Sequence, residues 1–203
     1  MKISELAAAT GVPLATIKLY QREGLLMPGD PITRTRSDYG QVHVDRVDLI
    51  RTLAALPGYN YQLLRELVGL IDDSGRPVGE RVAAAMRLLP SGSAGGGNPA
   101  LARAATESLG IPLDEDTAVA PQLGTALAAA EAVGLPCSDE RLEFYWGHMR
   151  AIAEFELSGL AETRDPNAAV QYAIVGTAVY EHLILALRRL AHQHLFPQQE
   201  LRT

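Results

Sequence analysis

The side chains best suited to chemistry lie close to the amino terminus, on a short stretch with helical periodicity. On a helical wheel of residues 13–23, the apolar side chains Leu14 and Ile17 share one side. The positions that we expect to face outward are Ala15, Thr16, Lys18, Tyr20 and Arg22. Hydroxyl, amino and guanidinium groups of this kind bind the phosphates and base edges of DNA. The stretch therefore predicts a helix that reads DNA.

The segment before this helix has the form of a helix-turn-helix. Residues 3–10 are rich in alanine and predict a short helix. Gly11 ends this helix, because glycine readily adopts the left-handed conformation that closes a helix. Pro13 then favours the first turn of the next helix. A helix, a glycine turn and a helix that starts at proline together predict a helix-turn-helix.

A small β wing is predicted after the second helix. The helix stops at Gly24, and two prolines then forbid further helix. Residues 32–42 alternate β-forming and polar side chains around a turn signal at Ser37 and Asp38. Arg34 and Arg36 are two positions apart, so we expect them to share one face of a strand. Both arginines are placed to reach a phosphate backbone.

Two further helices are expected to close this N-terminal unit. They cover residues 45–56 and 60–71, and Asn60 is a favourable N-cap for the second. Their apolar stripes consist of Val47, Leu49, Ile50, Leu53 and Leu56 in the first helix and Leu63, Leu64, Leu67, Val68 and Ile71 in the second. The result is a core of about 70 residues, near the lower limit for independent stability.

Residues 3–71 resemble the DNA-binding domain of the MerR family of transcription regulators. The family's second helix has the pattern T-I-R-Y-Y-E-R-x-G-L-L, and Thr16–Leu26 match it in order. The wing pattern S-G-Y-R-x-Y corresponds to Ser37–Val42, and the pattern L-G-F-S before the fourth helix corresponds to Pro57–Asn60. The chain departs from these patterns at Leu19, Gly40 and Val42.

The resemblance implies a homodimer on a pseudo-palindromic operator in double-stranded promoter DNA. Regulators similar to this chain commonly bend and untwist a promoter with an overlong spacer, so that they affect RNA polymerase through the promoter. Such deformation costs on the order of 1–6 kcal/mol. The predicted phosphate contacts are Arg22, Arg34, Arg36, Tyr20 and Tyr39. The predicted base-edge contacts are Ala15, Thr16 and Lys18.

Composition limits the class of protein. The chain has 203 residues, 47% of them hydrophobic, which is enough for one small and one larger folded unit. The net charge of −6 is unevenly distributed along the chain. Residues 1–65 hold eight cationic and six acidic side chains, whereas residues 77–203 hold nine cationic and fifteen acidic side chains. An acidic second half keeps the protein off random DNA. The apolar runs are interrupted before the roughly 20 residues that a bilayer needs, so we expect a cytoplasmic, nucleoid-associated protein with no membrane partner.

Neither a metal nor a cofactor is expected. Cys137 is the only cysteine, which leaves no thiolate cluster for a soft metal. Nine of the ten residues 90–99 are Gly, Ser, Pro or Asn, as in a flexible linker. Metal-sensing members of the family place a long dimerisation helix here, and this linker would break it. No nucleophile elbow, phosphate-binding loop or paired-carboxylate motif is present, so we expect no enzyme.

The predicted fold class is mainly α, with three parts. A winged helix-turn-helix DNA-binding domain with a small β wing covers residues 1–73, a connecting helix and linker cover 74–100, and an all-helical effector-binding or dimerisation domain covers 101–203. Within the connecting part, residues 78–89 are amphipathic. The candidate helices of the last part are 99–109, 122–133, 138–160 and 167–194, with one of the expected breaks at Pro121.

The C-terminal helices also predict a ligand site and a dimer interface. Aromatic and polar side chains of an expected effector pocket are Tyr145, Trp146, His148, Met149, Phe155, Tyr172 and Tyr180. Ordinary core and interface packing would explain the same residues. Either the last helix, which is apolar on more than one side, or the 78–89 segment could form the dimer interface. The alternative function is a constitutive DNA-binding protein whose C-terminal half binds another protein without a small effector.

Overall fold

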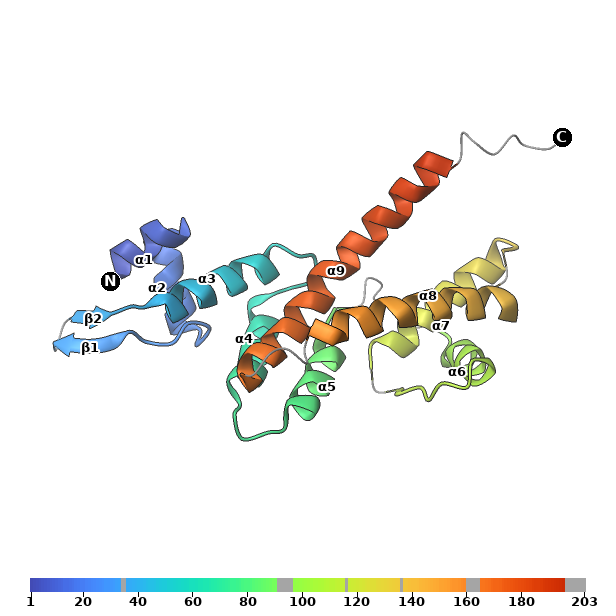
Figure 1. Ribbon diagram of the computed structural model, residues 1–203, viewed down its shortest axis with the longest axis horizontal. Helices are drawn as coiled ribbons and strands as arrows, with labels where there is room; N and C mark the ends of the chain where they lie inside the picture. The colour runs from blue at the N-terminus through green and yellow to red at the C-terminus, as the bar shows by residue number, and fades with distance from the viewer. Residues whose placement is uncertain (34–35, 91–96, 116, 136, 160–164, 196–203) are drawn as a thin grey trace.

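The computed structural model describes residues 1–33, 36–90, 97–115, 117–135, 137–159 and 165–195 (Figure 1). Within these residues the chain forms helices and one small sheet, as the sequence predicted. The elements are α1 (Ile3–Thr10), α2 (Leu14–Arg22), β1 (Asp30–Thr33), β2 (Arg36–Asp38), α3 (Gln41–Ala54), α4 (Tyr61–Asp72), α5 (Val78–Leu88), α6 (Pro99–Ser108), α7 (Val119–Ala132), α8 (Asp139–Ser158) and α9 (Pro166–Leu195). The mainly α fold class with an N-terminal winged helix-turn-helix is therefore confirmed.

The helix-turn-helix forms as its capping residues predict. Gly11 ends α1 with a φ of 67°, and Gly24 follows α2 with a φ of 71°. At the start of α1, the Glu5 carboxylate accepts a hydrogen bond from the Lys2 backbone N–H at 2.7 Å. Local signals of this kind mark where both helices end, since glycine adopts the positive φ of these positions without strain.

The wing is a two-stranded antiparallel sheet of β1 and β2. Its register pairs Asp30 with Asp38, Pro31 with Ser37, and Thr33 with Arg36. The predicted turn at Ser37 and Asp38 is wrong, because both residues belong to β2. The strand also starts before Ile32, since Pro31 is tolerated in a sheet that consists only of edge strands.

Helix α3 begins at Gln41, four residues earlier than predicted. The cause is the His43 side chain, whose Nδ1 accepts a hydrogen bond from the backbone N–H of Gly40 at 3.0 Å. The His43 Nε2 lies 3.2 Å from the carbonyl oxygen of Pro28 and donates to it. His43 thus takes the part of the N3 side chain in a capping box and joins the start of α3 to the loop before the wing.

One continuous core extends from the N-terminal helices into the C-terminal helix. Its fully buried side chains include Leu6, Ile17, Leu25, Leu26, Val47, Ile50, Leu53, Leu64, Leu67, Ile71 and Ile174. Ile174 belongs to the first half of α9, which packs against α4 and α5 (Figure 1). The predicted boundaries at residues 73 and 100 remain predictions, but α5 and α9 share the core of the N-terminal unit.

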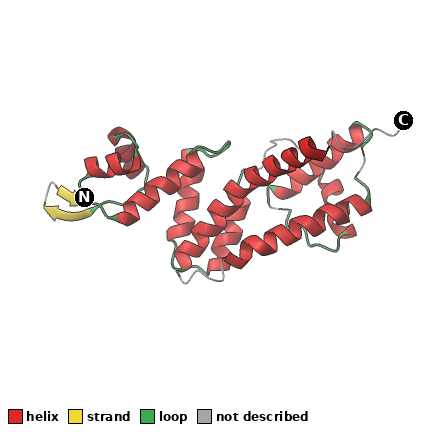
Figure 2. Ribbon diagram, turned by 45° about the horizontal axis from the view of Figure 1, so that its top comes forward, coloured by secondary structure: helices red, strands yellow, loops and turns green. Residues whose placement is uncertain are grey.

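Helices α6, α7 and α8 form a second group (Figure 2). Helix α7 starts at Val119, so the predicted break at Pro121 is wrong. Pro121 lies in the first turn of α7, where its missing N–H would have no helical partner anyway. Helix α8 begins after the predicted cap Ser138, whose Oγ accepts from the Arg141 N–H at 3.4 Å. No residue of α8 is buried.

Helix α9 is long and apolar enough, by length and composition, to cross a membrane, with a mean hydropathy of 1.4 over its best window. Length and composition alone are weak evidence for a membrane span, because core helices of soluble proteins meet the same criteria. The first half of this helix is packed in the core through Val170, Ile174 and Ala178. Glu181 and His182 interrupt its apolar surface near the middle.

Candidate nucleic-acid interface and ligand cavities

Helix α2 presents three of the predicted DNA-binding side chains to solvent. Ala15, Lys18 and Arg22 are exposed, and Thr16 is half-buried. Ile17, on the opposite side, is fully buried in the core. The nearest acidic partner of Arg22 is Glu23, at 3.6 Å from its Nε. The exposed side of α2 therefore carries cationic groups that are free to approach a nucleic acid.

Tyr20 does not face outward as the helical wheel suggested. It is a core residue whose ring lies 6.4 Å from the ring of Tyr61, measured between centroids. Tyr20 follows Ile17 by three positions, so the two share the inner face of the helix. Burial, and secondarily Tyr61, raises the pKa of the Tyr20 hydroxyl, against a lowering effect of Arg51. A phosphate contact by this hydroxyl remains a prediction.

Tyr39 is also buried, and it joins the wing to the helix-turn-helix. Its hydroxyl oxygen accepts a hydrogen bond from Gln21 Nε2 at 3.0 Å, and its ring meets the edge of the His43 ring at 5.1 Å. A Cβ added to Gly29 would lie 2.9 Å from the Tyr39 ring. Gln21, Gly29 and His43 therefore position the wing, a role that the sequence pattern did not reveal.

The structure describes only one of the two arginines predicted to lie in the wing. Arg34 lies outside the described residues. Arg36 begins β2 and pairs with Thr33 of β1. Their predicted phosphate contacts remain predictions. A further arginine, Arg51 of α3, donates from Nη1 to the carbonyl oxygen of Thr10 at 3.1 Å and thereby holds α1 against α3.

The predicted effector residues divide between two cavities. Tyr145, Trp146 and Met149 line a cavity of about 570 Å³ between α6, α7 and α8, which we call the α6–α8 cavity. Tyr172 and Tyr180 line another of about 780 Å³ between α3, α4 and α9, which we call the α3–α9 cavity. Tyr172 and Tyr180 also line a smaller cavity of about 280 Å³ between α5, α8 and α9, and the predicted effector residues therefore do not share one pocket.

The other two predicted effector residues lie outside both cavities. His148 Nδ1 is 2.7 Å from the carbonyl oxygen of Phe144, and the two rings lie 4.3 Å apart on the outer side of α8. Phe155 is 80% exposed. Effector binding by His148 and Phe155 stays a prediction, because the sequence could not show which helix each of them faces.

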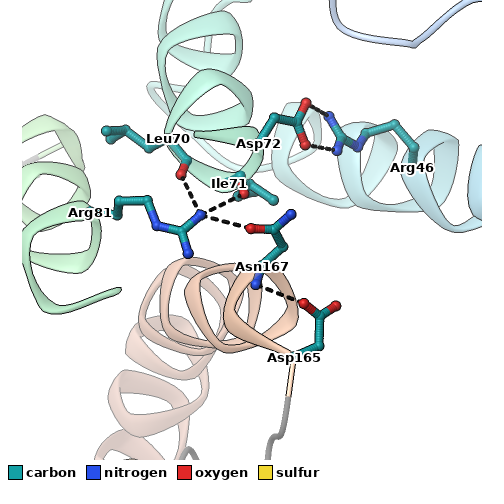
Figure 3. A network of polar contacts seen from close by, with 7 residues as sticks. All are labelled: Arg46, Leu70, Ile71, Asp72, Arg81, Asp165 and Asn167. Atoms are coloured by element: carbon teal, nitrogen blue, oxygen red, sulfur yellow. Dashed lines mark hydrogen bonds and ion pairs between the residues drawn. The ribbon is translucent and has the colours of Figure 1, made fainter. Parts of the chain in front are cut away.

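Buried arginines hold the walls of the α3–α9 cavity together (Figure 3). Arg81 of α5 is only 1% exposed, and its Nη1 donates to the carbonyl oxygen of Ile71 at 3.0 Å and to Asn167 Oδ1 at 2.8 Å. Its Nε has no hydrogen-bond partner among the residues that the structure describes. Arg46 of α3 makes a two-bond ion pair with Asp72 at the end of α4. These contacts connect α3, α4, α5 and the start of α9.

The described residues contain no group of three or more His, Cys, Asp or Glu side chains that could hold a metal ion. The α3–α9 cavity does carry the carboxylates of Asp45, Asp72 and Asp165. Asp72 is paired with Arg46, and Asp165 Oδ1 accepts from the Asn167 N–H at 3.0 Å.

Residues 1–69 match the sequence model of the MerR helix-turn-helix regulatory protein family. These residues form a MerR-family DNA-binding domain. The whole chain is similar to the crystal structure of a proposed transcriptional regulator from Streptomyces coelicolor A3(2), with 27% sequence identity, a TM-score of 0.73 and coverage of 98% of both chains. No curated protein sequence matches the chain. The MerR resemblance is thus confirmed for the N-terminal helix-turn-helix, and the two comparisons together support a DNA-binding transcriptional regulator.

Proposed function

We propose that this MerR-type regulator works as a homodimer on a pseudo-palindromic promoter operator, and that a non-metal small molecule bound among its C-terminal helices changes its action. In this proposal the protein is cytoplasmic, catalyses no reaction and affects RNA polymerase through the promoter. Bending and untwisting of the operator would supply the regulatory step, since such deformation has an energy that depends on the DNA sequence.

The homodimer is supported by the apolar side chains that α8 and α9 expose. The large apolar side chains exposed on these helices include Phe144, Phe155, Leu157, Leu183, Leu185, Leu187, Leu190 and Leu195. Large exposed apolar side chains that gather on one surface mark interaction sites, and association of two chains would remove those of α8 and α9 from water. Of the two dimerisation elements that the sequence left open, α9 is favoured, because α5 is already covered by α4 and α9.

A small effector is supported by the two cavities. Their volumes of about 570 and 780 Å³ lie within the range of about 300–1,000 Å³ that small-molecule sites occupy. The α3–α9 cavity also borders α3, the helix that follows the wing, so an occupant there would contact the DNA-binding unit directly. The alternative, a C-terminal half that binds another protein, draws on the same exposed apolar surface of α8 and α9.

The proposal is tested by sedimentation of the full chain, with binding to DNA from the promoter of its own coding region measured in parallel. We expect a dimer that binds one full operator, with affinity on the order of 100-fold weaker for a single half-site, because the second half-site contact becomes intramolecular. A monomer that binds half-sites and full sites equally well would contradict the proposal.

The effector is tested by thermal shift of the full chain against apolar and cationic metabolites. Compounds that stabilise the protein are then added to the operator complex, where a change in affinity or in DNA bending is expected. If no compound stabilises the chain while it tightly captures a cellular protein, the alternative function is correct.

A further inference from the structure

The side of α8 that is turned toward α6 and α7 borders the α6–α8 cavity. Leu142, Tyr145, Trp146 and Met149 are spaced at three and four positions, so they lie on one side of the helix. This side is turned toward α6 and α7, where a core face would normally be buried. Tyr145, Trp146 and Met149 are nevertheless 46%, 39% and 45% exposed. The α6–α8 cavity explains this exposure, because the opposite wall is too far away to cover them.

The walls of this cavity are almost entirely apolar and carry no unpaired charge. Leu109, Ile111, Leu123 and Leu127 of the α6–α7 side face the aromatic residues of α8. Among the described lining residues the only ionisable carboxylate is Asp114, and Arg87 of α5 donates two hydrogen bonds to it, from Nε at 3.2 Å and from Nη2 at 2.9 Å. A charged ligand would lose its hydration here without gaining an opposite charge.

The threonine hydroxyls of the lining are also occupied as donors. The Thr106 hydroxyl donates to the carbonyl oxygen of Ala102 at 3.0 Å, and the Thr117 hydroxyl donates to that of Asp114 at 2.7 Å. Each can still accept a hydrogen bond, because a hydroxyl oxygen has two lone pairs. A ligand of this cavity needs few polar groups, which can pair with the threonine oxygens as donors or with the Tyr145 hydroxyl and the Trp146 indole N–H as acceptors.

We propose that the α6–α8 cavity is the effector site and that it takes a neutral, largely apolar molecule with an aromatic ring system. This inference rests on the proposed function, which it deepens by naming the site and the ligand class. The aromatic wall of Tyr145 and Trp146 favours ring stacking, and the absence of an unpaired charge in the described lining selects against ions. The ligand borders Asp114, so the Arg87–Asp114 ion pair connects the site to α5 and the N-terminal core.

The test uses two probes that share one ring skeleton. N-phenyl-1-naphthylamine is neutral, and 8-anilinonaphthalene-1-sulfonate adds a sulfonate to the same rings. With the full-length protein we expect the neutral probe to bind one site per chain, and the sulfonate to bind at least about tenfold more weakly. Energy transfer from Trp146, the only tryptophan, reports binding at this wall. Binding should also slow alkylation of Cys137, which lines the cavity.

Matched variants of α7 locate the site. Ala130→Phe places a ring inside the cavity and should abolish both the energy transfer and the protection of Cys137. Ala129→Phe adds the same ring at an exposed position that does not line the cavity and should leave both signals unchanged. If Ala130→Phe does not fold, Ala126→Phe at the exposed rim of the cavity provides the same test.

Oligomeric state and operator binding are measured in the same samples. Loss of dimerisation in Ala130→Phe without probe binding by the native chain would show that a second copy fills the cavity and would overturn the inference. Preferred binding of the sulfonate would also overturn it. If a dimer binds the operator while neither probe binds, this inference fails and the proposed function stands. A chain that neither dimerises nor binds an operator would refute the proposed function itself.

Discussion

At the scale of single residues, Arg81 is the side chain whose environment most needs an explanation. It is buried without a carboxylate partner, but its guanidinium faces carbonyl oxygens at the end of α4. The C-terminal end of a helix carries a partial negative charge, which compensates the cation. Arg81 therefore stabilises three elements together, since it also bonds Asn167 at the start of α9.

Replacing Arg81 by methionine should lower the free energy of unfolding by about 2–4 kcal/mol, because the acceptors on Ile71 and Asn167 lose their buried donor. The measurement is urea unfolding followed by circular dichroism. Arg76→Met is the matched control, since Arg76 is exposed and pairs only with Asp73, at 3.1 Å. We expect that control to change stability by less than about 0.5 kcal/mol. Equal effects of both substitutions would contradict the assigned role of Arg81.

Ionisation of the Tyr59 hydroxyl is expected to lower the stability of the folded protein at high pH. Burial, with a smaller contribution from Glu181, raises the pKa of the Tyr59 hydroxyl from 10.0 to about 12. The folded protein therefore keeps this proton at pH values where the unfolded chain releases it. The stabilisation is complete below pH 10 and is lost as the pH rises toward about 12. Tyr59→Phe should flatten the fall of unfolding free energy over this range, and an unchanged slope would argue against this origin.

The exposed cations of α2 make separable contributions to DNA binding. Arg22→Ala should weaken binding to all sequences alike and reduce the salt slope by about one, as expected for a phosphate contact. Lys18→Ala should instead reduce discrimination between operator and unrelated DNA, because this residue is predicted to reach base edges. Fluorescence anisotropy over a salt series measures both. Arg141→Ala, an exposed change on α8, serves as control and should alter neither quantity.

At the scale of elements, a pair of glycines fixes how α7 meets the segment before α6. A Cβ on Gly124 would lie 2.3 Å from the backbone oxygen of Asn98, and a Cβ on Gly97 would lie 2.0 Å from that of Pro121. Backbone atoms cannot move aside as the tip of a flexible side chain can. The close approach of α7 to this segment therefore requires glycine on both sides.

Gly124→Ala should destabilise the protein, although alanine is the better helix former by about 1 kcal/mol. The clash between the added Cβ and the Asn98 backbone outweighs the gain in helix propensity, so the net change in stability is a loss. Gly147→Ala in α8 is the matched control, because nothing lies within 4 Å of the added Cβ. We expect that control to stabilise the chain by up to about 1 kcal/mol in thermal unfolding. Stabilisation by both alanines would show that the segment does not pack on α7 as described.

Elements with local start and stop signals could be predicted from the sequence, and those fixed by distant contacts could not. Gly11, Asn60 and Ser138 cap their helices as predicted. The position of the wing against α2 depends on Tyr39, which bonds Gln21 from another element, and this contact has no local signature. The early start of α3 likewise depends on the buried His43 ring.

In the candidate sites too, local sequence patterns predicted some features, and contacts between distant residues determine the others. The exposed side of α2 follows from helical periodicity, apart from Tyr20, whose inward position is set by Ile17 and Tyr61. The effector residues were selected by type alone, and only the packing of α6 and α7 shows that Tyr145 and Trp146 share a cavity. Residues such as Leu109, which form the opposite wall, have no distinguishing sequence pattern.

At the scale of the whole molecule, α9 has two different halves. Its first half completes the core of the DNA-binding unit, and its second half projects from the body with exposed leucines (Figure 1). A dimer formed through the second half would thus be joined rigidly to α4 and α5 through a single helix. The spacing between two DNA-binding units would then depend on how α9 is seated, which is where the Arg81 contacts lie.

A substitution on the projecting half of α9 tests this arrangement. Leu183, Leu187 and Leu190 share one stripe of the helix, and Leu187 is 53% exposed. Leu187→Gln removes apolar surface from the centre of this stripe and should shift sedimentation from dimer toward monomer. Affinity for the full operator should fall with it, while affinity for a half-site stays the same, because α2 lies in a different part of the molecule. Arg188→Gln changes the neighbouring face of α9 and should leave the dimer intact. A dimer that survives Leu187→Gln but dissociates on Phe144→Gln would place the interface on the outer side of α8 instead.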